Sequence, residues 1–155
     1  MKKNDKMRLH MLLEEFWNWF GYTKEEYAQM NMQFDPGEFM FPKWEELIKN
    51  IKYYISQGTD DEDIIDDILT VMALDNESEN VLDDIVENAN DEFCLKIIEK
   101  GVNHIQHEAR WQVAEIILHR KPDNAIRWLD ELMLDKDDYV KKRAENAKDL
   151  YDEVL

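Results

Sequence analysis

Apolar residues recur at helical spacing along most of the 155-residue chain, and this periodicity constrains the fold more than any other feature. Apolar side chains three or four positions apart share one face of a helix. The four clearest stripes are Leu9, Leu12, Leu13, Phe16 and Phe20; Trp44, Leu47, Ile48, Ile51 and Ile55; Ile64, Ile65, Ile68, Leu69 and Met72; and Val81, Leu82, Ile85, Val86 and Ala89. Because no stretch alternates as a strand would, we expect an all-α protein with no sheet.

Glycines and capping motifs divide these stripes into separate helices. Gly21, Gly58 and Gly101 stand where a left-handed residue commonly ends a helix. Residues 23–26 and 59–62 both fit the reciprocal capping box, in which a threonine and a glutamate cap a helix start. The later helices are expected near residues 91–100, 104–119, 123–134 and 138–152. About nine helices result, and short loops between them favour antiparallel helix pairs.

A repeat signal comes from the last third of the chain. Residues 135–150 read DKDDYVKKRAENAKDL, an acidic turn followed by a helix with Val140, Ala144 and Ala147 on one face. This pattern resembles the second helix of a HEAT repeat, with Lys141 where that family prefers arginine. A shift of 31 residues aligns the earlier positions Ala109, Arg110, Val113 and Ile116 with Val140, Lys141, Ala144 and Ala147. The resemblance implies a stack of helix pairs, a fold commonly used to hold other proteins.

Length and composition favour one domain over residues 1–155, since a chain of this size holds one substantial core. We expect a helical N-terminal part at about 1–58, an acidic helical part at about 59–90, and HEAT-like repeats at about 91–152.

The only cysteine, Cys94, has apolar neighbours, which predicts a buried thiol and a reducing compartment. Glu14 and Glu15 interrupt the opening apolar stretch, so we predict no signal peptide and a cytoplasmic protein.

The charge of the chain is concentrated in one segment. The formal net charge is −17, and residues 60–92 contain 14 acidic residues and no lysine or arginine. Helical phase places two groups of carboxylates opposite the apolar stripes, which predicts two solvent-facing acidic ridges. The six expected partner-binding residues are Asp63, Asp66 and Asp67 in the first ridge and Asp83, Asp84 and Glu87 in the second. The sequence leaves open whether both ridges face the same way.

Such a charged surface either keeps the protein soluble or binds a positively charged partner. Carboxylates of one sign repel one another, and interspersed lysines would relieve this cost if solubility were the only requirement. The sign excludes nucleic acid as a direct partner, because nucleic-acid binding needs basic residues. A basic protein is therefore the expected partner, and nucleases are the commonest small basic proteins that a cell must keep bound.

Small size, an all-helical stack and concentrated acidity resemble the immunity proteins of contact-dependent growth inhibition and other polymorphic toxin systems. This resemblance implies an inhibitor that binds a cognate toxic nuclease and covers its active site or RNA-binding surface. A general HEAT-like scaffold or adaptor protein is the alternative.

Catalytic and metal-binding patterns are sparse in this sequence. His104 and His107 are three residues apart, and His107-Glu108 resembles one metal-binding motif of deoxyhypusine hydroxylase. That family requires several His-Glu pairs, whereas this chain has one. Nucleophile elbows, phosphate-binding glycine loops and zinc-protease motifs are also missing from the sequence. We therefore expect no enzyme activity, no metal and no cofactor.

Three large apolar residues, Phe39, Met40 and Phe41, precede Pro42 in an expected loop. They form either a staple that folds back over the first helices or an anchor for a partner's pocket.

Overall fold

The computed structural model describes residues 3–30 and 40–154, and in these ranges it contains nine helices and no strand. The helices are α1 (Lys3–Phe20), α2 (Lys24–Ala28), α3 (Trp44–Gln57), α4 (Glu62–Leu74), α5 (Asn80–Asn88), α6 (Asp91–Gly101), α7 (His107–Arg120), α8 (Ala125–Leu132) and α9 (Asp138–Leu150). The predicted all-α class is confirmed, and every helix expected after residue 90 lies within a few residues of its predicted bounds. None of the helices in these ranges is long and apolar enough to cross a lipid bilayer.

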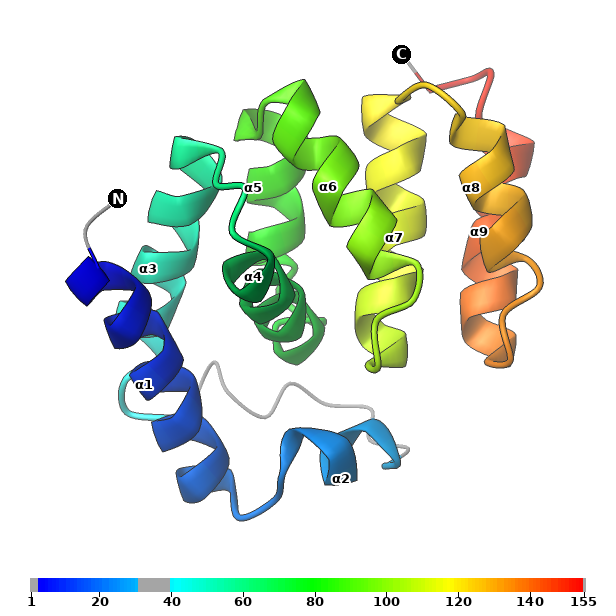
Figure 1. Ribbon diagram of the computed structural model, residues 1–155. Coiled ribbons are helices and arrows are strands. Elements are labelled where there is room, and N and C mark those ends of the chain that lie inside the picture. Colours follow the sequence, from blue (N-terminus) through cyan, green and yellow to red (C-terminus); the bar gives the residue numbers. More distant parts are fainter. Residues whose placement is uncertain (1–2, 31–39, 155) are drawn as a thin grey trace.

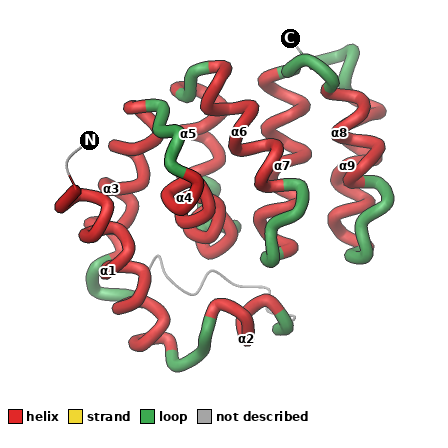
Figure 2. Tube along the Cα trace, viewed as in Figure 1, coloured by secondary structure: helices red, strands yellow, loops and turns green. Residues whose placement is uncertain are grey.

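The helices stack in two layers (Figure 1). Helices α3, α5, α7 and α9 follow one another in one layer, and α1, α4, α6 and α8 lie on its other side. The short helix α2 belongs to neither layer and is connected to the end of α1 by a short turn (Figure 2). The central helix α7 packs against α4, α5, α6, α8 and α9, so it is the element around which the second half is built.

The four predicted apolar stripes form the core. All their members are buried except Phe20, Ile48 and Val86, which are partly buried and pack against the same cluster. One continuous group of buried apolar side chains runs from Leu9 to Ala147. Cys94 is also buried, and burial raises the pKa of its thiol, so it is a packing residue as predicted.

Capping chemistry explains where two of the helices begin. The predicted box at α2 is present: the Glu26 amide donates to the Thr23 hydroxyl, and the Thr23 amide donates to the Glu26 carboxylate. The second predicted box is wrong, because Asp61 is the cap of α4 and accepts from the amides of Asp63 and Ile64. Thr59 instead accepts a hydrogen bond from the Asp61 amide and orders the turn before the helix.

Two of the three predicted left-handed glycines are confirmed and one is not. Gly21 and Gly58 have φ of 87° and 62°, as expected at helix ends. Gly101 is instead the last helical residue of α6. A Cβ atom there would lie 2.4 Å from Val113 Cγ2 and 3.1 Å from Leu69 Cδ2. The absence of a side chain at Gly101 therefore allows α6 to approach α7 and α4.

The loop before α3 acts as the predicted staple where it is described. Phe41 is buried, and its ring lies 5.4 Å from the rings of both Phe16 and Trp19. Met40 is exposed, and Phe39 lies outside the described residues. Because Phe41 is part of the core, it is not available as an anchor for a partner.

The small residues of α9 pack tightly against α7, which gives the first testable prediction. Val140, Ala144 and Ala147 are all fully or almost fully buried. Replacing Ala144 with Leu adds volume to a closely packed contact and should lower the free energy of unfolding by about 1–3 kcal/mol. Thermal or urea denaturation measures this change. Asn146→Leu, on the exposed face of the same helix, is the control and should change stability by less than about 0.5 kcal/mol. Equal effects of the two substitutions would contradict the packing described here.

Candidate partner-binding surfaces

The first acidic group, on α4, faces a groove and not open solvent. Asp63, Asp66 and Asp67 line a cavity of about 1180 Å³ between α4 and the arm formed by α1 and α2. Asp63 is exposed, whereas Asp66 and Asp67 are half-buried. The prediction of a solvent-facing ridge is therefore wrong for Asp66 and Asp67, because α1 and α2 cover the polar face of α4. The apolar periodicity of α4 shows which face of that helix is polar, but it does not show that other helices cover that face.

Asp66 is the most heavily engaged of these carboxylates. Its Oδ2 accepts from Lys24 Nζ at 2.6 Å, and its Oδ1 lies 3.3 Å from His104 Nε2. Burial alone would raise the pKa of Asp66. The hydrogen bonds from His104 and Lys24, together with the charge of Lys24, outweigh burial and hold this pKa well below its usual range. Asp66 is thus a structural anion that connects α4 to α2 and to the loop before α7.

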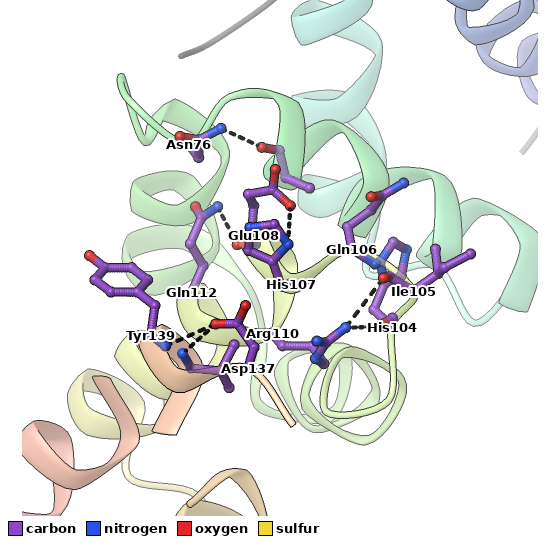
Figure 3. A network of polar contacts seen from close by, with 12 residues as sticks. Asn76, His104, Ile105, Gln106, His107, Glu108, Arg110, Gln112, Asp137 and Tyr139 are labelled. Atoms are coloured by element: carbon purple, nitrogen blue, oxygen red, sulfur yellow. Dashed lines mark hydrogen bonds and ion pairs between the residues drawn. The ribbon is translucent and has the colours of Figure 1, made fainter. Parts of the chain in front are cut away.

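His104 is fixed by contacts to both ring nitrogens. Its Nδ1 accepts from the backbone amide of Gln106 at 3.1 Å, so the ring proton lies on Nε2 and is directed at Asp66 and Thr70. The Gln106 side chain donates to the backbone oxygen of Lys24 at 3.0 Å. The His104 carbonyl accepts from Arg110 Nη1 at 2.7 Å (Figure 3). These contacts position α2 against the stack.

Arg110 continues this network towards the end of the stack. Its Nε and Nη2 bind Asp135 at 2.8 and 3.2 Å in a bidentate, buried ion pair. The pair connects the start of α7 to the loop between α8 and α9. Lys141, the residue aligned with Arg110 after the 31-residue shift, instead pairs with Asp138 on the surface.

Asp67 differs from Asp66 because it makes no hydrogen bond or ion pair with another described residue. Its pKa is raised to about 6, mainly by burial and also by the neighbouring Asp66 and Asp63 carboxylates. The interactions of Asp67 with His10 and Lys24 lower the pKa but do not offset this rise. Asp67 is therefore the one carboxylate of α4 that lines the groove without an ion-pair partner among the described residues.

The second acidic group, on α5, is open to solvent at two of its three residues. Asp83 and Glu87 are exposed and Asp84 is half-buried. No lysine or arginine of residues 6–30 or 40–154 forms an ion pair with these three carboxylates. Asp84 accepts a hydrogen bond from Asn88 at 2.7 Å, within its own helix. The helices α4 and α5 that carry the two acidic groups lie in different layers of the stack (Figure 1).

One acidic residue of the segment has a structural role that the sequence did not reveal. Asp75 is fully buried at the end of α4, and its Oδ2 accepts from the backbone amide of Val81 at 2.9 Å. This contact caps the start of α5, where Glu79 provides no side-chain cap. An aspartate six residues before the amide that it caps follows no short capping pattern, so only the structure identifies it.

The two histidines considered as a metal site, His104 and His107, contact different carboxylates. His104 belongs to the Asp66 network, whereas His107 Nδ1 lies 3.2 Å from Glu108 Oε1. Glu108 is buried, which raises its pKa, and the nearby Tyr27 side chain of α2 acts against this rise. Over the part of the chain that the structure describes, no three histidine, cysteine, aspartate or glutamate side chains are grouped so that they could hold a metal ion.

Comparison with protein-family models, with curated proteins and with solved structures gives no match to this chain.

The raised pKa of Asp67 predicts a pH-dependent stability. A carboxyl with a folded pKa of about 6 and an unfolded pKa of 3.8 stabilises the fold below about pH 4, and this contribution is lost as the pH rises through 6. Asp67→Asn should therefore raise the free energy of unfolding at pH 7 by roughly 1–2 kcal/mol, after allowance for solvent screening, and have little effect at pH 4. Thermal unfolding between pH 4 and 7 measures the difference. Asp63→Asn, at an exposed position, is the control; equal pH profiles for the two variants would contradict the assignment.

Proposed function

We propose that this protein is a binding inhibitor of the immunity type, which neutralises a basic toxic partner, a nuclease domain, by covering its active site or substrate-binding surface. The observation that carries the proposal is the open acidic ridge of α5, formed by Asp83, Asp84 and Glu87. Like charges on adjacent turns repel one another, and a basic partner surface would remove that repulsion on binding.

The distribution of internal ion pairs supports this choice of ridge. Lys6 and Lys24 reach α4 from the arm, at 2.7 Å from Asp61 and 2.6 Å from Asp66. Among the described residues no comparable cation reaches the three carboxylates of α5. The chain thus supplies cations to Asp61 and Asp66 on the face that it covers, and it supplies none to the three carboxylates that α5 presents.

Direct binding of nucleic acid is disfavoured by the same contacts. The basic opening of the chain includes Lys6 and Arg8, and both are engaged in ion pairs, with Asp61 and Glu46 respectively. An acidic surface would repel a phosphate backbone. The proposed activity needs neither a cofactor nor a catalytic residue, and it belongs in the cytoplasm, where a nuclease would meet its substrate.

A general scaffold or adaptor of the HEAT-like kind is the second candidate, and the two-layer stack of helix pairs favours it. The two functions differ in outcome, because a scaffold binds its partner without abolishing the partner's activity.

Rescue of growth tests the proposal. Genes for immunity proteins stand directly behind the genes for their toxins, so the protein encoded upstream, or a domain of it, should arrest growth when expressed alone. Co-expression of this chain should restore growth. Joint replacement of Asp83, Asp84 and Glu87 by Lys should abolish the rescue, since facing like charges cost several kcal/mol of binding free energy.

The control variant carries the same change in net charge elsewhere. Glu145→Lys, Asp149→Lys and Asp152→Lys alter exposed residues in and after α9, and this variant should still rescue growth. Circular dichroism should show that both variants are folded. The proposal is wrong if the upstream domain is harmless, or if the α5 variant rescues as well as the parent.

A further inference from the structure

The groove between α1, α2 and α4 has two chemically different walls. On α1, Met7 and Met11 lie four residues apart, hence on one helical face, and are 55% and 48% exposed. Tyr22, 45% exposed, extends this apolar wall towards α2. Methionine side chains are flexible and polarisable, which suits a surface that adapts to a partner's apolar residues. Met7 and Met11 thus form an exposed apolar pair on α1, and Tyr22 adds an exposed ring just after the end of that helix.

The opposite wall is acidic. It contains the α4 carboxylates Asp63, Asp66 and Asp67. The α1–α2 arm adds Glu14, Glu25 and Glu26 and the two lysines, so the whole groove has a net charge of −4 with His10 neutral. Both lysines are already engaged, Lys6 with Asp61 and Lys24 with Asp66. Asp67 is the carboxylate of α4 that has no cationic partner among the described residues. A positive group entering the groove would therefore meet an uncompensated charge beside an apolar surface.

The size of the groove favours a polypeptide segment over a small molecule. Its volume of about 1180 Å³ exceeds the roughly 300–1,000 Å³ of typical small-molecule sites. Its walls are also fixed before any ligand arrives. Gln106 binds the backbone of α2, and Tyr27 of α2 is buried against Trp17 and Phe20 of α1. A preformed groove saves the ordering cost that a mobile one would impose on binding.

We propose that this groove is a docking site for an amphipathic, lysine- or arginine-bearing segment of a partner protein, whose apolar side chains contact Met7, Met11 and Tyr22 and whose cation pairs with Asp67. The mode is that of an amphipathic helix laid in a groove. The inference rests on the proposed function in that both require a basic protein partner, but it concerns a different surface from the α5 ridge. A second copy of this chain is a poor occupant, because each copy carries a net charge of −17.

Selection from a random library of displayed 16-residue peptides, with the folded full-length protein as bait, tests the inference. Enriched peptides should carry lysine or arginine together with leucine, isoleucine or phenylalanine at helical spacing. Calorimetry on the tightest peptide should then show about tenfold weaker binding to Met7→Ser/Met11→Ser and to Asp67→Asn. All three positions lie at the groove surface, and Asp67→Asn is expected to be at least as stable as the parent.

The matched control is Asp83→Asn, which removes one carboxylate from the α5 ridge and should bind the peptide within about twofold of the parent. The inference is overturned if the library yields no binder, if the binders are acidic or neutral, or if the groove variants bind as the parent does. It is also overturned if sedimentation shows that the parent self-associates and Met7→Ser/Met11→Ser abolishes this.

The growth assay separates the two proposals. Suppose that the α5 variant fails to rescue growth and Met7→Ser/Met11→Ser rescues it fully. This result would support the proposed inhibitor function and show that the groove is not part of the interface with the toxic partner. Peptide binding in the groove without any rescue of growth would support the groove alone.

Discussion

Asp66 is bound on one side by Lys24 and on the other by His104, and the placement of the α1–α2 arm depends on this arrangement. The apolar stripe of α4 is buried, so its polar face must be accommodated elsewhere in the fold. The chain covers that face with an arm that brings Lys6 and Lys24 to it, and Gln106 holds the arm from the stack side. An acidic helix that would otherwise be a solvated ridge thus becomes one wall of a groove. The helix α5 has no such cover, and its carboxylates stay open to solvent.

Most of the fold follows from local features of the sequence, because helix faces and caps involve residues a few positions apart. The apolar stripes predict which faces are buried, and the Thr23 capping box marks the start of α2. The predictions that fail concern features that tertiary contacts determine. Asp61, not Thr59, caps α4, since an aspartate two residues later offers an equally good acceptor. Gly101 lets α6 pack closely against Val113. No local sequence pattern distinguishes such a packing glycine from one that ends a helix.

The candidate site was predictable in composition but not in arrangement. Charge counting identifies residues 60–92 as the segment with uncompensated acidity, and helical phase correctly puts Asp83 and Glu87 on the surface. Neither indicates that Asp66 is a structural anion or that α1 supplies an apolar wall opposite it. The groove is built from residues about 40 to 60 positions apart, as with Lys24 and Asp66. Only the packing of the arm brings such residues together, and a single sequence contains no signal for it.

The central claim is that uncompensated acidity on this protein attracts a basic partner. Stopped-flow measurement of association with the basic partner that the proposed function requires, between 0.01 and 0.15 M salt, tests it most directly. The screening length falls from about 30 Å to about 8 Å over that range. The association rate constant should therefore fall about tenfold or more, while the dissociation rate constant changes much less. An association rate constant that does not depend on salt would contradict the claim and reduce the acidic surface to a means of keeping the protein soluble.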